Sequence, residues 1–446
     1  MSAWSGIFSP RLSERFNALS DPRNAALTDY STASLLWTGI LMFVCRLGAR
    51  RQIQHVLNTP NAVSYLRELS GQDDLKRVPH GDTLKNLLLE LPEGEPRDLA
   101  TALVGSLIEK RRLEFARLPG GYYTVALDAT GWLVLGYAPS RFTQGCLRRK
   151  LSNGKTLYHR PVLEAKLVTP TGLVLSVETE FTENPPRPGQ SEEEYKQDCE
   201  HSGAKRLLPR LRKRFPRLPI CLLLDSLYAD GPIFDLCLEL DLRFITVLKE
   251  GSIPSVYNEF YALIPHKPEN PKTVYAKNVV QVIRWINGID YRGRKVNVLE
   301  CVETDRTTGK VTTWLWVTDI PITPDNCVGL AQSGGRQRWR IENEGYNVQK
   351  NGGYRMEHAY AQAPRTAKNF YLLLQIAHTL AQLFECRTGG KKQVTRRFGS
   401  LKNLAALLLE CFRTQPMLRG SRRERFMNTR IQARLNRAPD WPPARL

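Results

Sequence analysis

The stretch YYTVALDAT at residues 122–130 and the stretch PICLLLDS at residues 219–226 decide the fold class. Each contains a short apolar run, which is typical of a central strand buried on both faces, and each run ends in an aspartate, Asp128 or Asp225. Residues just beyond the carboxyl ends of central strands meet at the functional crevice of an α/β sheet. An aspartate after a strand also caps turns and helices, so the two residues indicate a site only as a pair.

Apolar patterns outside these two strands divide the chain into three parts. Residues 1–118 have helical spacing that stops at a Leu-Pro-Gly-Gly break, which predicts a helical domain. Residues 119–390 alternate strands and helices and predict an α/β domain, and a run of strand patterns alone at about 270–322 predicts an all-β insertion within it. Residues 391–446 predict a helical segment and a basic C-terminal arm, which carries eight arginines and two acids from Pro416 onward.

The charge balance indicates the class of partner. Lys and Arg outnumber Asp and Glu by 64 to 44, which gives a net charge of +20 and an isoelectric point near 9.7. Such a surplus favours a polyanion, above all nucleic acid, over a protein that is merely basic. The longest apolar run, residues 33–45, is too short to cross a bilayer, so it predicts a buried helix and no membrane contact.

The cysteines indicate the compartment. Nine cysteines are scattered along the chain without a Cys-x-x-Cys pair, so a zinc site is not expected. Their odd number, with no secretory signal before them, predicts reduced thiols in a cytoplasmic protein. With nucleic acid as the expected partner, the protein would be associated with the nucleoid.

A third acidic candidate lies in the stretch RWRIENEGYNVQKNGGY at residues 338–354. Taken as one α-helix at about 100° per residue, residues 338–350 place four side chains on one stripe: Arg338, Glu342, Tyr346 and Gln349. Glu344 points to the opposite side. The spacing also fits a surface helix in which Arg338 and Glu342 form a weak ion pair, and spacing alone does not choose between Glu342 and Glu344.

Carboxylates that face a DNA phosphodiester need a cation. Hard oxygen ligands suit Mg²⁺ or Mn²⁺, and two such ions roughly 4 Å apart can hold the attacking and leaving oxygens of an in-line phosphoryl displacement. Asp128, Asp225 and a glutamate of the expected helix are therefore candidate ligands for two ions. Glu180 and Glu183 are typical of turn or cap residues, and they are the alternative third acid if Glu342 faces solvent.

Three stretches, VALDATGW, LLLDSLYADGP and RWRIENEGYNVQKNGGYRMEH, together resemble the DDE transposases of bacterial insertion sequences, in the group with a β-rich insertion between the second Asp and the Glu. The resemblance covers about residues 21–385 and implies a ribonuclease H-like catalytic core. It places the metal-binding triad at Asp128, Asp225 and Glu342, which selects Glu342 over Glu344.

The same resemblance assigns residues around the glutamate. Arg338 matches the arginine that relatives carry four positions before the Glu, and it is therefore a catalytic candidate. The position of their tyrosine holds Gly335 in this chain. The position of their lysine holds Gln349, with Lys350 one residue late, so the arginine role carries over better than the other two.

The function that the resemblance implies is DNA transposition: metal-dependent strand cleavage followed by transfer of the freed 3′ end to target DNA. The helical N-terminal region would bind the terminal inverted repeats as double-stranded DNA, and the protein would act on DNA as a homodimer. The alternatives are a metal-dependent nuclease without joining activity and a transposase-derived DNA-binding protein that has lost catalysis. Further candidates for DNA contacts, each with a structural role as its alternative, are Lys350, Trp132, His358, Arg212 and Lys213.

Overall fold

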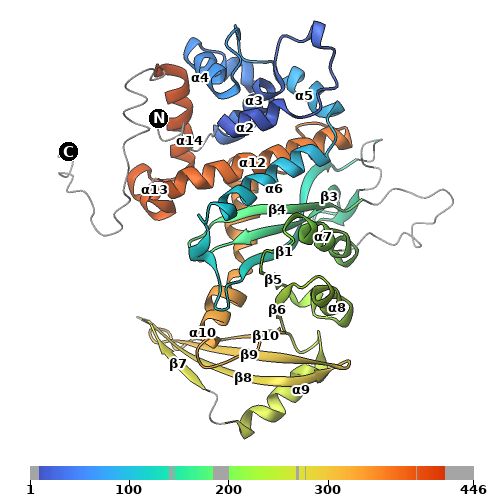
Figure 1. The fold of residues 1–446 in the computed structure, drawn as a ribbon, viewed down its shortest axis with the longest axis vertical. Helices are drawn as coiled ribbons and strands as arrows, with labels where there is room; N and C mark the ends of the chain where they lie inside the picture. Colours follow the sequence, from blue (N-terminus) through green and yellow to red (C-terminus); the bar gives the residue numbers. More distant parts are fainter. Residues whose placement is uncertain are drawn as a thin grey trace, which may run out of the picture.

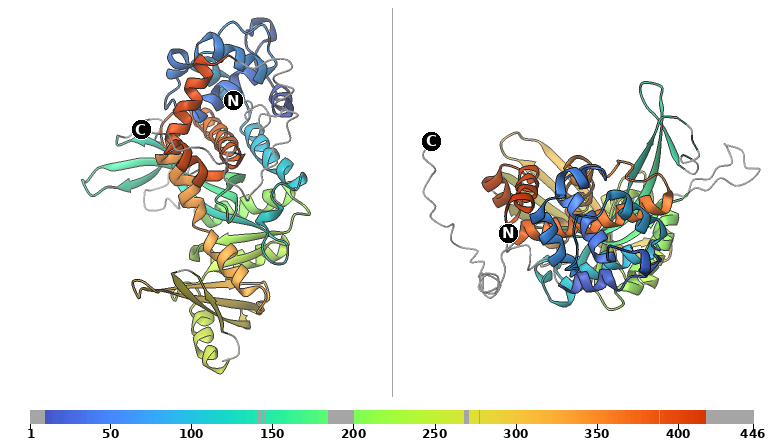
Figure 2. Two further views of the ribbon diagram at one scale, coloured as in Figure 1. Left: turned by 90° about the vertical axis from the view of Figure 1, so that its left-hand side faces the viewer. Right: turned by 90° about the horizontal axis from the view of Figure 1, so that it is seen from above.

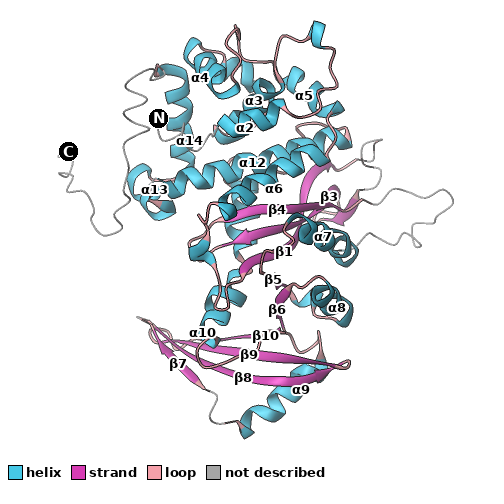
Figure 3. Cartoon of the chain, viewed as in Figure 1, coloured by secondary structure: helices cyan, strands magenta, loops and turns pink. Residues whose placement is uncertain are grey.

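The structure is a computed structural model that describes residues 10–416, apart from residues 139, 141–142, 144–145, 184–199, 268–270, 277 and 388. It is a mixed α/β protein built on one ten-stranded sheet (Figures 1 and 3). The strand order is β2-β3-β1-β5-β6-β10-β9-β8-β7, and β4 also pairs with β3. The strands are β1 (Tyr123–Gly136), β2 (Leu147–Lys150), β3 (Thr156–Val168), β4 (Val174–Phe181), β5 (Ile220–Leu224), β6 (Arg243–Val247), β7 (Lys272–Tyr275), β8 (Val279–Tyr291), β9 (Arg294–Asp305) and β10 (Val311–Thr318).

The centre of the sheet is parallel and its two sides are antiparallel. β5 lies parallel to both β1 and β6, whereas every other pairing in the described sheet is antiparallel. In the region expected to be strand-only, β7 to β10 follow one another without a helix. These strands are not a separate unit, however: β10 pairs with β6 through Trp316↔Val247, so the insertion prolongs the central sheet.

The helices lie at one end of the molecule and on both faces of the sheet (Figure 1). Those of the N-terminal region are α2 (Pro10–Asn17), α3 (Thr32–Val44), α4 (Pro60–Ser70), α5 (Gly81–Glu90) and α6 (Gly94–Glu109). Those of the middle region are α7 (Glu200–Arg214), α8 (Gly231–Glu239), α9 (Pro254–Leu263), α10 (Cys327–Gly329) and α11 (Val348–Asn351). The last are α12 (Pro364–Arg387), α13 (Gly390–Phe398) and α14 (Leu401–Thr414), and the basic arm lies outside the described residues from position 417 onward.

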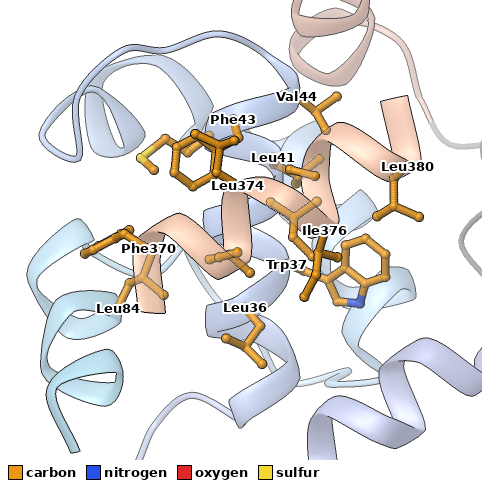
Figure 4. Packing of buried hydrophobic residues seen from close by; sticks show 14 of the residues in the cluster. Leu36, Trp37, Leu41, Phe43, Val44, Leu84, Phe370, Leu374, Ile376 and Leu380 are labelled. Atoms are coloured by element: carbon orange, nitrogen blue, oxygen red, sulfur yellow. The ribbon is translucent and has the colours of Figure 1, made fainter. Parts of the chain in front are cut away.

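The N-terminal region is helical, as expected, but it shares its core with the C-terminal helices. Every residue of α3 is buried, which explains its apolar sequence, and α12 packs directly across it (Figure 4). Gly39 makes this crossing possible, because an added Cβ would collide with Leu373 of α12. The helices before residue 118 therefore do not form a core of their own, because they share one with helices from the C-terminal part of the chain. No helix within the described ranges is long and apolar enough to cross a membrane.

The two faces of the sheet are covered by different helices. Val125 and Leu127 of β1 enter a core with α6, α7 and α8, whereas Ala126 enters a core with α10 and the helical segment 330–351. This division follows from the alternation of side chains along a strand. A central strand covered on both faces must be apolar throughout, which is why its sequence does not alternate.

Candidate active site

The carboxyl ends of β1 and β5 bring the two predicted aspartates to one edge of the sheet. β1 and β5 are paired in parallel as far as Ala126↔Leu223, and the same register continued for two residues sets Asp128 beside Asp225. Because side chains alternate along a strand, Asp128 of β1 is on the same face as Ala126, which contacts the segment 330–351. This is the face that carries the third predicted acid.

The segment that was expected to be one α-helix, residues 338–350, contains a π-helix (Ile341–Asn347) followed by the short helix α11 (Val348–Asn351). A 3-10 turn (Gly335–Gln337) precedes it. Hydrogen bonds in a π-helix join residues five apart. Ile341 and Tyr346 are five apart, and both are buried in the same core. The expectation of a continuous α-helix is therefore wrong, because packing against the sheet favours the wider turn.

Glu342 and Glu344 lie on different sides of this segment. Glu342 Oε1 accepts a hydrogen bond from Arg338 Nη2 at 2.7 Å, and Nη1 of the same guanidinium is 4.0 Å from Asp128 Oδ1. One guanidinium therefore stands between two of the three predicted acids. Glu344 pairs instead with Arg340 at 3.4 Å. Glu342, whose side chain is half exposed, is the glutamate directed towards Asp128.

The surroundings of Asp128 favour its protonated form. Burial raises the pKa of the Asp128 carboxyl to about 7, with Arg338 opposing the rise and Glu342 and Glu200 adding to it. The main-chain oxygen of Asp128 accepts a 2.6 Å hydrogen bond from the Tyr346 hydroxyl, which ties the π-helix to β1 at this residue. A carboxyl that holds its proton near neutrality, in a cluster of other acids, is a feature of functional sites.

Glu200 is a fourth acid at this edge, and reasoning from the sequence missed it. It is the first residue of α7, and its carboxylate accepts a hydrogen bond from the Tyr228 hydroxyl at 3.2 Å. Burial raises the pKa of Glu200 and the charge of Asp225 adds to the rise, while the Tyr228 hydrogen bond opposes it. The sequence predicts one helix over residues 191–215, in which Glu200 is the tenth residue, so no sequence signal singles it out.

The donor set at this edge fits a hard divalent cation. Asp128, Asp225, Glu200 and Glu342 offer carboxylate oxygens, which Mg²⁺ and Mn²⁺ prefer. Burial is the main cause of the raised pKa of Asp128, and the charges of Glu342 and Glu200 add to it. Within the described ranges, no three His, Cys, Asp or Glu side chains stand close enough together to hold a metal ion. Because the guanidinium of Arg338 lies between Asp128 and Glu342, we expect it to turn aside when a cation binds.

Two residues predicted to contact DNA serve the fold instead. Trp132 is 3% exposed and packs against Phe181 and Tyr371, so it offers no surface on which a displaced base could stack. The guanidinium of Arg212 donates to several main-chain oxygens around the end of α7, including that of Leu240 at 2.7 Å. Because these bonds occupy its donors, the Arg212 guanidinium stabilises the fold and is not available to bind a phosphate.

The other three DNA candidates are more accessible. Lys350 pairs with Glu357 at 2.9 Å. His358 is near the ring of Tyr360, and burial lowers its pKa. Lys213 is exposed but lies thirteen residues along α7 from its start, which is about 20 Å away from the acidic edge. Of the three, Lys350 follows the π-helix most closely.

The alternative third acids, Glu180 and Glu183, take part in ion pairs elsewhere. Glu180 accepts from Arg206 and Arg210 on α7, and Glu183 lies 2.7 Å from Lys368 on α12. These pairs fasten helices to the sheet, which agrees with a structural role for both glutamates.

A buried polar network explains why position 349 does not hold a lysine. Gln349 is fully buried, and its Nε2 donates to Gln375 Oε1 at 2.8 Å. Lys166 Nζ donates to the same oxygen at 2.6 Å and lies 3.2 Å from Glu164. A lysine at position 349 would bring a second buried ammonium next to Lys166, with only Glu164 to balance both, which is costly.

On the transposase hypothesis, Arg338 should matter more for DNA cleavage than Lys350. Arg338→Ala removes the guanidinium between Asp128 and Glu342 and should slow cleavage by about 100-fold, the usual cost of losing one charge-stabilising donor. Lys350→Ala breaks a single partly exposed pair with Glu357 and should slow it by less than about tenfold. Single-turnover cleavage rates at saturating Mg²⁺ measure both effects. An equal or larger loss for Lys350 would contradict the assignment of Arg338.

Comparisons with known proteins assign no family to the chain. No protein-family model matches the sequence, and no curated protein matches it significantly. The function is therefore argued from the residues and the geometry of the acidic edge.

Proposed function

We propose that this protein is a DDE-type DNA transposase, which cuts DNA strands and transfers the freed 3′ end to target DNA. The observation that carries the proposal is the guanidinium of Arg338 between Asp128 and Glu342, at the edge of the sheet where the parallel strands β1 and β5 end and Asp225 follows β5. An acidic edge in a chain of net charge +20 suits metal-dependent chemistry on a polyanion.

The topology of the sheet supports a ribonuclease H-like core. The antiparallel strands β4, β3 and β1 are followed across the sheet by β5 and β6, which run parallel to β1, and helices cover both faces. The strands β7 to β10 come between Asp225 and Glu342 in the sequence. A β-rich insertion at this place is the feature of the transposase group that the motifs resemble.

The residues of the acidic edge would have distinct roles. Asp128, Asp225 and Glu342 would hold two divalent cations, which supply activation of water or of a 3′-hydroxyl as the nucleophile. Arg338 would bind a phosphate oxygen of the DNA, because a guanidinium offers paired donors to a phosphate. Tyr346 holds the π-helix on β1, so that Glu342 stays beside Asp128.

Trp339 is the better candidate for the stacking role first expected of Trp132. It follows Arg338 in the sequence, and its side chain is 46% exposed although it is large and apolar. An exposed indole beside a phosphate-binding arginine offers a flat surface for an unpaired base. Trp132 has no such surface because it is buried.

A strand-transfer assay tests the proposal directly. The full chain is incubated with Mg²⁺, a labelled DNA fragment that contains its gene with the flanking sequence, and a target plasmid. Labelled fragment joined to the plasmid would support a transposase. Cut but unjoined fragment would show a nuclease, and bound but uncut fragment would show a DNA-binding protein without catalysis. Absence of any DNA binding would overturn the proposal.

Binding of Mn²⁺ without DNA should strengthen as the pH rises. Burial keeps the pKa of Asp128 at about 7 in the metal-free protein. Below that pH the cation must displace a proton, so the affinity should fall by up to about tenfold per pH unit and level off above pH 7. Titration calorimetry between about pH 6 and pH 8 measures the affinity and the proton release. The result is contradicted if the affinity is constant over this range or if Asp128→Asn keeps the same pH dependence.

A further inference from the structure

A ribbon of strands projects from the body of the molecule beyond the acidic edge, as the teal segment in both views of Figure 2 shows. The ribbon consists of residues 131–136 of β1 and residues 147–161, which form β2, a turn and the start of β3. From Pro161 to the turn at Asn153 the chain advances eight residues, or about 26 Å at 3.3 Å per residue. The ribbon is thus long enough to contact a partner that extends well beyond the acids.

The exposed side chains of the ribbon are strongly basic. Residues 146–157 contain Arg148, Arg149, Lys150 and Lys155 and no acid, and all four basic side chains are exposed. The pairing of β2 with β3 places Arg148 and Lys150 on one face of the ribbon and Arg149 on the other. Lys155 lies next to the turn, so positive charge covers both faces and the tip.

The base of the ribbon joins the segment that follows the π-helix. The main-chain nitrogen of Val134 donates to the main-chain oxygen of Glu357 at 3.1 Å, and the side chain of Glu357 pairs with Lys350 at 2.9 Å. Burial lowers the pKa of His159, and the charges of Arg149 and Lys350 lower it further. One imidazole therefore lies close both to a cation of the ribbon and to a cation of the segment that carries the third acid.

We propose that this ribbon is an arm that binds the phosphate backbone of double-stranded DNA next to the acidic edge. Basic side chains with no acid among them attract a polyanion and release its counterions. At 3.4 Å per base pair, an arm of about 26 Å runs along roughly eight base pairs. Phosphate contacts of this kind position a duplex without reading its sequence. The inference rests on the proposed function and adds the surface along which DNA reaches the acids.

Charge on an edge strand has a second use, which is to prevent edge-to-edge pairing with another sheet. β2 is the edge strand of the ribbon. A second copy of this chain is a poor partner for it, because Arg148, Arg149 and Lys150 would meet the same three charges on the other copy. DNA is attracted by these charges. Their removal should therefore weaken DNA binding if the ribbon binds DNA, and should leave DNA binding unchanged if the charges only protect the edge.

The test compares two variants that remove the same charge from different places. Arg149→Gln, Lys150→Gln and Lys155→Gln are combined in the ribbon variant, which keeps the edge polar. The control variant removes three positive charges from exposed side chains that precede β1 and β5, at the amino ends of these strands and away from the acidic edge. Its substitutions are Lys110→Gln, Arg112→Gln and Arg217→Gln. Fluorescence anisotropy with a labelled duplex of arbitrary sequence, about 40 base pairs long, gives the affinity of each protein at several salt concentrations. Circular dichroism and thermal melts check that both variants are folded.

The ribbon variant should bind the duplex more weakly, and its slope of log K against log salt should be shallower by up to about 2.7, which is 0.9 for each of three lost phosphate contacts. The control variant should keep the wild-type slope. A wild-type slope in the ribbon variant, or an equal loss in the control, would overturn the inference. So would self-association of the ribbon variant with unchanged DNA binding, because the charges would then only protect the edge. Wild-type protein that binds no duplex would instead overturn the proposed function.

Discussion

Asp225→Asn is expected to abolish DNA cleavage while leaving DNA binding almost unchanged. The substitution keeps the size of the side chain and its hydrogen bond with the main-chain nitrogen of Ser226, but it removes a negative charge from the edge where Asp128 lies. An amide is a weaker ligand for a hard cation than a carboxylate. Because the proposed cations would assemble the reaction centre, the rate should fall by at least about 1000-fold.

A matched control for this experiment lies on α8. Asp235 is exposed and pairs with Arg294, away from the acidic edge, so Asp235→Asn makes the same chemical change without touching a proposed ligand. Cleavage rates and gel-shift affinities are measured for both variants at several salt concentrations. We expect the salt dependence of binding to be the same in both, because neither aspartate contacts phosphates. Normal cleavage by the Asp225→Asn protein would refute the two-metal assignment.

Lys166→Met is expected to lower the free energy of unfolding by about 3–5 kcal/mol, the cost of leaving one partner of a buried ion pair alone. Lys166 and Glu164 are both fully buried on β3, with Lys166 Nζ 3.2 Å from Glu164 Oε2. Glu164 also accepts hydrogen bonds from Ser176, Thr179 and Tyr371, so its carboxylate is held in place by donors that suit the charged form.

Two further variants separate the buried pair from a general effect of losing a lysine. Lys295→Met breaks an exposed pair with Asp290 of similar length, 2.6 Å, and should cost less than about 1 kcal/mol. Lys166→Met combined with Glu164→Gln removes both charges and should be more stable than Lys166→Met alone. Urea unfolding followed by circular dichroism measures all three. A loss below about 1 kcal/mol for Lys166→Met would contradict the stabilising role of the buried Lys166–Glu164 pair.

The same network links the stability of the protein to the geometry of the acidic edge. Lys166 shares the oxygen of Gln375 with Gln349, which follows the π-helix, and its ammonium lies 5.7 Å from the ring centre of Tyr346. Tyr346 in turn bonds to Asp128. Removal of Lys166 should therefore also slow cleavage, because Glu342 would be held less firmly beside Asp128.

The sequence alone determined the elements whose signal is local. The apolar runs ending at Asp128 and Asp225 specify buried central strands, because only a strand covered on both faces is apolar throughout. The largely apolar run that became α3 specifies a buried helix for the same reason. The strand patterns after residue 270 are properties of short segments, and the net charge of +20 is a sum over all residues. Neither depends on contacts between distant residues.

Only the tertiary structure decided how these elements meet. The π-helix arises because Ile341 and Tyr346 both have to pack on the sheet. Glu200 joins the acids because the first residue of α7 lies, in space, near the carboxyl end of β5. The insertion strands continue the sheet because β6 offers them an unpaired edge. These contacts form between segments that are far apart in the sequence. The periodicity of a segment indicates only which of its own faces is buried, and not which other segment covers that face.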